Sequence, residues 1–279
     1  MVKSVFSTLA GILVLGVVCG FSQSPTQTPR PSVNRMENVR PLQDRDETNF
    51  SRRTSIENLP PEYRVSAKAA KRAKLTDEEK ESYKEAKKDG VKLLKLFIAP
   101  KCAEKLVIDV SDERCAGNFD YIPISYYSFF DGIYGQLYGE LRMLEDSLIA
   151  GSGRYVHGFL IDLGDEEIGA LEKKSPRVKK LVDYTIAKTV DEAEKQINAL
   201  EEGIDYENEI VSSRKKIVAG HTYLMRIVAY AAPDETMSPY NYDSVLAFRI
   251  EKLTDDSMVI ILWKKISEKS APKLQNSKK

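Results

Sequence analysis

Histidine is the side chain that most often transfers protons near neutral pH, and the chain has two, His157 and His221. His157 lies in the segment GRYVHGFLIDL, where the two-residue period of a strand places it on the face opposite Val156. A Ser-His-Asp triad would also need an exposed nucleophile, but the chain contains no G-x-S-x-G elbow, and residues 151–153 (GSG) are typical of a hairpin turn. We therefore predict that both histidines are structural or surface residues, and we assign no catalytic residue.

Carboxylates are the next candidates for acid–base chemistry. Asp162 lies on a predicted strand, and Asp165, Glu166 and Glu167 follow directly after that strand. Paired carboxylates hydrolyse glycosides only when they face each other across a gap that holds a sugar. Neighbours on one turn rarely provide this gap, and the alternating spacing of a calcium loop is missing. The pattern favours a solvated turn, with a carboxylate-based, glycosidase-like hydrolase as the alternative.

Aromatic side chains crowd into the segment YIPISYYSFFDGIYGQLY. Clustered tyrosines on an exported protein can stack on sugar rings or form a partner interface. Strand alternation would divide them between two faces, one of which can belong to the core. A binding surface and a core therefore stay open as alternatives for Tyr126, Tyr127, Phe129, Phe130, Tyr134 and Tyr138.

The composition excludes several other classes of function. The 42 basic and 42 acidic residues balance, whereas a globally basic nucleic-acid binder depends on a positive field. The chain has no phosphate loop, no Rossmann glycine pattern and no H-E-x-x-H helix, and its three cysteines and two histidines offer few metal ligands. We therefore expect no cofactor, no metal and no nucleic-acid partner.

The N-terminal residues 1–22 resemble a signal peptide. Lys3 precedes an apolar stretch that is shorter than a membrane-spanning helix, and Gly20 and Ser22 suit cleavage before Gln23. We predict an extracytoplasmic protein, periplasmic or secreted. Cys19 leaves a lipoprotein anchored through that cysteine as the alternative, although the preceding residues depart from the lipoprotein pattern. Membrane contact is expected only through the signal or this lipid.

Export leaves Cys102 and Cys115 as the cysteines of the mature chain. Outside the cytosol, two such cysteines are typical of a structural disulfide. A redox-active pair is the alternative, but it usually has the closer Cys-x-x-Cys spacing. We predict the Cys102–Cys115 disulfide.

The domain organisation follows from shifts in composition. Residues 23–61 are rich in proline and poor in apolar residues, which predicts a disordered linker. Residues 62–99 predict a helical lead-in, with a capping box at Thr76 and Glu79 and last turns ending before Pro100. Its basic residues form either a solvated face or a surface for anionic polymers or headgroups.

Residues 100–267 predict a β-rich globular domain, followed by a disordered polar tail over 268–279. A capping box at Thr189 and Glu192 begins one packed helix that Gly203 ends. The fold class is α+β: a helical lead-in, then a mainly antiparallel sheet or sandwich with that helix. The predicted strands are 105–110, 121–130, 136–149, 155–163, 178–187, 208–212, 217–231, 244–253 and 258–266, the last three forming a meander.

These features favour a non-catalytic binding or scaffolding module of the cell envelope or the secreted fraction. The partner is expected to be an envelope glycan or a protein.

Overall fold

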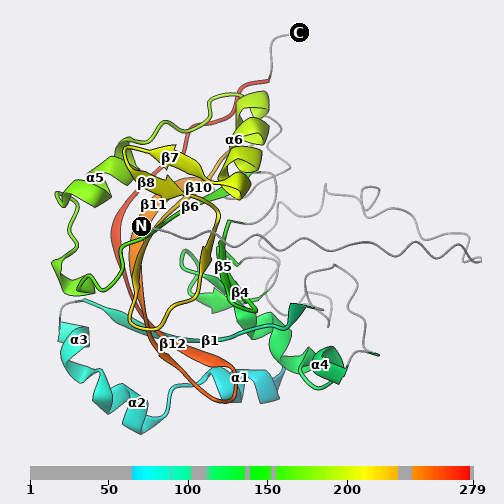
Figure 1. Cartoon of the computed structure of the whole chain (residues 1–279). Coiled ribbons are helices and arrows are strands. Elements are labelled where there is room, and N and C mark those ends of the chain that lie inside the picture. The colour runs from blue at the N-terminus through cyan, green and yellow to red at the C-terminus, as the bar shows by residue number, and fades with distance from the viewer. Residues whose placement is uncertain are drawn as a thin grey trace, which may run out of the picture. The chain divides into compact units, whose positions relative to one another are not determined.

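The computed structural model describes residues 65–88, 90–101, 111, 113–135, 139–151, 155–231 and 241–276. In these residues the fold is mixed: antiparallel strands predominate and helices are fewer (Figure 1), as predicted at this level. The helices are α1 (Ala67–Ala73), α2 (Asp77–Ser82), α3 (Lys84–Lys88), α4 (Glu113–Ala116), α5 (Pro176–Asp183) and α6 (Val190–Glu202), with the 3₁₀ helices η6 (Phe119–Ser125) and η7 (Ile168–Ala170). The strands are β1 (Lys92–Phe97), β2 (Tyr126–Ser128), β3 (Ile133–Tyr134), β4 (Leu141–Leu144), β5 (Ser147–Ala150), β6 (Val156–Asp162), β7 (Ile204–Tyr206), β8 (Glu209–Val211), β9 (Arg214–Lys216), β10 (Thr222–Ala229), β11 (Tyr242–Leu253) and β12 (Met258–Lys269).

The larger sheet has the strand order β1-β12-β11-β10-β6, and all of its pairs are antiparallel. The hairpin turn between β11 and β12 is closed by the Thr254 amide, which donates to the Met258 carbonyl at 2.8 Å. The predicted hairpin and the meander of the last three strands are therefore confirmed.

A second antiparallel sheet has the order β3-β2-β4-β5-β9, and β7 pairs with β8 as a separate hairpin. Isolated bridges connect segments of the two larger sheets: Ala99 pairs with Leu144, Gly151 with His157, and Leu160 with Ser212. The approach is close where β5 meets β6, since a Cβ added at Gly158 would lie 2.3 Å from the backbone of Ala150. The two sheets thus enclose a common interior.

Two hydrophobic cores lie on opposite faces of the larger sheet. Alternate residues of β10, including Tyr223, Met225 and Ile227, face the interior shared with the second sheet. Leu224 and Val228 face the other way, into a core covered by α5 and α6. Because β10 is buried on both faces, its sequence is an apolar run apart from Thr222 and Arg226.

Both predicted capping boxes are confirmed. Thr76 begins α2 with Glu79, and Thr189 begins α6 with Glu192; in each box the hydroxyl and the carboxylate accept the reciprocal backbone amides. Gly203, at φ +92°, ends α6 in a conformation that an L side chain would resist. Local capping chemistry was thus sufficient to locate these two helices.

The predicted helical turns over residues 91–100 are wrong, because this segment forms β1. Leu94 and Leu96 are buried in the core between the sheets, and Leu94 pairs with Ile261 of β12. The period of the buried residues is therefore two. A short apolar run does not distinguish a strand from a helix until its partner is known.

Three predicted strands also need correction. Residues 178–187 mostly form α5, where Pro176 occupies the first turn and Val178 and Leu181 share a buried face, so α6 is not the only packed helix. The first part of 121–130 is η6, which contains Pro123. The predicted strand over 136–149 is divided by a turn at Glu145. This residue has a φ of 51°, and no glycine at this position indicated a turn in the sequence.

The predicted disordered tail is wrong over residues 268–276. β12 continues to Lys269, Leu274 is buried in the core beneath the helices, and Lys273 and Gln275 pair with Ala231 and Thr189. The tail is polar in composition, but its isolated apolar residues Ala271 and Leu274 are buried in this core.

Several predictions lie outside the described residues. They are the signal peptide over 1–22, the linker over 23–61, the strand over 105–110, and the roles of Cys19, Cys102 and Tyr138. Among the helices that the structure describes, none is long and apolar enough to span a bilayer.

Candidate functional site

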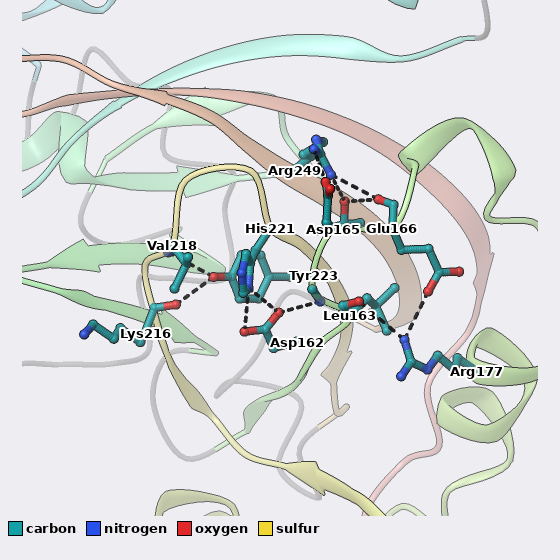
Figure 2. Close-up of polar contacts among 12 residues, drawn as sticks. Asp162, Leu163, Asp165, Glu166, Arg177, Lys216, Val218, His221, Tyr223 and Arg249 are labelled. Carbon is teal, nitrogen blue, oxygen red and sulfur yellow. Dashed lines mark hydrogen bonds and ion pairs between the residues drawn. The ribbon is translucent and has the colours of Figure 1, made fainter.

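Asp162 and His221 meet at one end of the larger sheet (Figure 2). Asp162 is the last residue of β6, which pairs with β10, and His221 lies just before β10 begins. The Nδ1 atom of His221 lies 3.0 Å from one carboxylate oxygen of Asp162 and 3.1 Å from the other. The His221 side chain is 34% exposed and that of Asp162 is 32% exposed, so the pair lies at the rim of the fold and not in its core.

The segment that follows Asp162 is held by several elements. The Leu163 amide donates to the Thr222 carbonyl at 2.9 Å, and the Thr222 amide donates to the Gly164 carbonyl at 2.8 Å. The Gly164 amide donates to Oδ1 of Asp162 at 2.9 Å. These bonds fix the backbone on both sides of the Asp162–His221 pair.

The neighbouring acids are held by different arginines (Figure 2). Arg249 of β11 forms an ion pair with Asp165 at 2.6 Å and donates to the Glu166 carbonyl at 3.2 Å. Arg177 of α5 binds the Glu166 carboxylate at 3.1 Å. The predicted polar turn is therefore ion-paired through Asp165 and Glu166, and these two carboxylates fasten the segment to β11 and α5.

Lys215 of β9 lies within electrostatic reach of Asp162. Partial burial lowers the pKa of the Lys215 amine, and the charges of Asp162 and Glu209 counteract this effect. Its Nζ donates to the Ile210 carbonyl at 2.7 Å. The Lys215 amine is therefore partly desolvated and hydrogen-bonded to β8.

A second charged pair, Arg226 with Asp243, is buried within the larger sheet. Two guanidinium nitrogens donate to the two carboxylate oxygens, each at 2.8 Å. The third nitrogen donates to the carbonyls of Leu181 and Tyr184, each at 2.9 Å. Every nitrogen of the guanidinium therefore has a partner, and the pair anchors the end of α5 to β10 and β11.

The predicted aromatic cluster is divided between core and surface. Tyr126, Tyr127 and Phe129 are buried, and the hydroxyl of half-buried Tyr134 donates to the Lys95 carbonyl at 3.0 Å. Phe130 differs, because it is 44% exposed. Most of the described members thus belong to the core, and a binding surface centred on Phe130 stays a prediction.

Phe130 stacks on Tyr242, with ring centroids 4.4 Å apart and ring planes 6° from parallel. The buried carboxylate of Glu140 accepts hydrogen bonds from the amides of Phe129 and Phe130 and from the hydroxyl of Tyr242. Burial raises the pKa of Glu140 to about 7, against the opposing effect of these three hydrogen bonds. Glu140 therefore links the turn of one sheet to the first residue of β11 in the other.

Sequence reasoning did not identify Glu140 as important. Glu140 lies between the aromatic segment and the apolar run LRML. A single acid between two apolar segments indicates a buried carboxylate that needs hydrogen-bond partners. Sequence reasoning also missed the contact of Asp162 with His221, because these residues are 59 positions apart and meet only through the pairing of β6 with β10.

His157 is buried, as a structural histidine should be. Its Nδ1 lies 3.3 Å from Oε1 of Gln196, and its ring packs edge-on against Tyr230. It lines a cavity of about 130 Å³ together with Glu201 and Ser213, which is too small for most organic ligands.

Cys115 is fully buried in α4. Its predicted disulfide partner lies outside the described residues, so the disulfide stays a prediction. In the part of the chain that the structure describes, no group of three or more histidine, cysteine, aspartate or glutamate side chains is placed to hold a metal ion.

Comparison with protein-family models, with curated proteins and with solved structures finds no match for this chain.

Proposed function

We propose that this chain is an exported module that binds an envelope glycan or an envelope protein without transforming it. The signal-like residues 1–22 support export, and the proline-rich residues 23–61 suit a spacer between an anchor or cleavage site and the folded domain. The observation that carries the binding function is the exposed Phe130 ring stacked on Tyr242.

The arrangement around Phe130 is suited to recognition because it is ordered in advance. The Glu140 carboxylate holds the backbone of the turn, and Tyr242 holds the ring in one orientation. A ring that is already ordered loses little side-chain entropy when a ligand binds. The C–H face of a pyranose, or an apolar side chain of a partner, can pack against such an aromatic surface.

A glycan is the better-supported partner of the two. The exposed ring is followed in the chain by Asp131, which is also exposed, so a polar residue lies next to Phe130. Sugars combine an apolar face with hydroxyl groups at the rim and match one aromatic ring beside a carboxylate. Protein interfaces usually need a wider apolar centre.

The carboxylate-based hydrolase gains no comparable support. Two of its candidate acids after Asp162, Asp165 and Glu166, are engaged by Arg249 and by Arg177, on different elements. A glycosidase needs two carboxylates that face a shared gap. We therefore favour binding over hydrolysis of a glycan.

A retention experiment with the full-length chain tests this function. Phe130→Ala and Phe119→Ala are matched variants, because both rings are 44% exposed, Phe119 lies in η6 and Phe130 lies in the turn after β2. We expect immobilised peptidoglycan and other envelope glycans to retain the wild type and the Phe119 variant. Loss of an ordered aromatic contact should weaken retention of the Phe130 variant by about tenfold, and Phe130→Trp should restore it.

Equal retention of the Phe130 and Phe119 variants would contradict the assignment of the binding surface. If the wild type binds neither envelope glycans nor envelope proteins, the proposed binding function is wrong.

A further inference from the structure

Glu140 is a buried acid without a counter-charge. The residue is 3% exposed, and in the part of the chain that the structure describes no lysine or arginine forms an ion pair with it. Buried Asp243 differs, because Arg226 lies 2.8 Å from its carboxylate. A carboxylate that is buried without a cation loses its hydration and gains no ion pair, so the surroundings of Glu140 favour the neutral acid.

The hydrogen bonds of Glu140 hold the turn that carries Phe130. Oε2 accepts the amides of Phe129 and Phe130, the latter at 3.1 Å, and Oε1 contacts the hydroxyl of Tyr242. Tyr242 is also the residue on which the Phe130 ring stacks. One side chain therefore fixes both the backbone of the exposed ring and the tyrosine that orients it.

The neutral form of Glu140 can make the same three contacts. Oε2, as a carbonyl oxygen, has two lone pairs for the two amides, and a proton on Oε1 can be donated to the oxygen of Tyr242. The ionised form keeps a charge inside the fold. This cost is relieved when the carboxylate reaches water, and to do so it must leave the amides of the turn.

The ionisable groups that face Glu140 do not stabilise its charge. On the turn, the negative charge of Asp131 disfavours the ionised form. On β2, burial raises the pKa of Tyr127, so this phenol stays neutral, and β11 contributes the hydroxyl of Tyr242. Burial, with a smaller effect of Asp131, raises the pKa of Glu140 to about 7 against its three hydrogen bonds.

We propose that the protonation state of Glu140 controls whether the Phe130 ring is ordered for glycan binding. The neutral acid holds the turn against Tyr242, and loss of its proton to water releases the turn. This inference rests on the proposed function, in which the ordered ring is the form that binds. Because the ordered form holds the proton more tightly, glycan affinity should be high in mildly acidic solution and should fall as the pH rises through about 7.

The test measures the binding of soluble peptidoglycan fragments to the full-length chain by calorimetry between about pH 5.5 and about pH 8.5. The apparent Kd of the wild type should rise at least about fivefold, because the fraction with an ordered ring decreases. Glu140→Gln keeps the hydrogen-bonding pattern of the neutral acid without a titratable group, so its Kd should change less than about twofold.

Glu145→Gln is the matched control. It makes the same substitution at an exposed residue of the turn after β4, and it should show the same rise in Kd as the wild type. All three proteins bind the same fragments, so titration of groups on the ligand affects them equally.

A second measurement needs no ligand. In nuclear magnetic resonance spectra of the free wild type with ring-labelled phenylalanine, the Phe130 signals should change with a midpoint near pH 7. The signals of equally exposed Phe119 should stay constant. Glu140→Gln should remove the transition.

A wild-type Kd that is independent of pH, or a Glu140→Gln variant that keeps the wild-type rise, would overturn this inference and leave glycan binding in place. If Glu140→Gln does not fold, constant Phe130 signals in the free wild type would overturn it. If the wild type binds no glycan at any pH, the proposed function is wrong, and the signals of the free chain then decide whether Glu140 orders the turn.

Discussion

The larger sheet carries two pairs of opposite character, one at its buried centre and one at its rim. Arg226 and Asp243 are 2% and 1% exposed, and the guanidinium is fully engaged by Asp243 and by the end of α5. Asp162 and His221 are about one third exposed, and the second ring nitrogen of His221 has no partner in the described chain. A buried pair whose hydrogen-bonding capacity is complete serves structure, whereas a partly exposed pair contributes little to stability.

The largest expected effect comes from breaking the buried pair. Asp243→Ala would leave Arg226 charged and without its carboxylate inside the sheet, which should lower the free energy of unfolding by about 3–5 kcal/mol. Chemical denaturation followed by circular dichroism measures this change. Asp165→Ala is the matched control: it also removes an arginine partner, but its side chain is 84% exposed, and the cost should stay below about 1 kcal/mol. Similar losses in the two variants would contradict the structural role of the buried pair.

The pH dependence of stability should reveal Glu140. Burial raises its pKa from 4.5 to about 7, so the folded chain binds the proton more tightly than the unfolded chain does. The resulting stabilisation is complete below the pKa of the unfolded chain and is lost as the pH rises through about 7. The shift corresponds to about 3 kcal/mol.

Glu140→Gln retains the shape of the side chain without a titratable group. The difference in unfolding free energy between wild type and this variant should therefore change by that amount between about pH 4 and pH 8. The other carboxylates contribute equally to the pH dependence of both proteins, so their contributions cancel in this difference. A difference that is constant across this range would show that Glu140 titrates normally.

The smallest expected effect comes from the rim. Asp162→Ala removes a partly exposed partner of His221, and such pairs contribute little to stability, so the loss should be below about 1 kcal/mol. The same denaturation experiment measures it. If Asp162→Ala lowers the free energy of unfolding as much as Asp243→Ala does, the Asp162–His221 pair is also structural. The two pairs would then not differ in role.

The parts of the fold that local chemistry determines were predictable from the sequence. Capping residues located α2 and α6, and alternating apolar residues located β6, β11 and β12. The errors occurred where tertiary partners decide the outcome: the apolar run at Leu94–Phe97 becomes a strand only because β12 lies beside it. The same limit applies to the sites. No local pattern links Asp162 to His221, or Glu140 to Tyr242, because these contacts depend on strand pairing and sheet packing.

The aromatic segment shows how burial separates residues of one type. Its sequence predicted either a core or a binding surface, and the described tyrosines and Phe129 are at least half-buried, while Phe130 is exposed. The difference arises at the turn after β2, where Glu140 binds two successive amides. The function proposed for the chain therefore depends mainly on one ring.

Nuclear magnetic resonance with ring-labelled phenylalanine tests that claim most directly. The full-length chain is titrated with soluble peptidoglycan fragments, and the ring signals of Phe130 and Phe119, assigned through their alanine variants, are followed. We predict saturable shifts of the Phe130 signals, with the Phe119 signals unchanged. Shifts confined to Phe119, or to rings of the buried core, would contradict the assignment of the binding surface to Phe130.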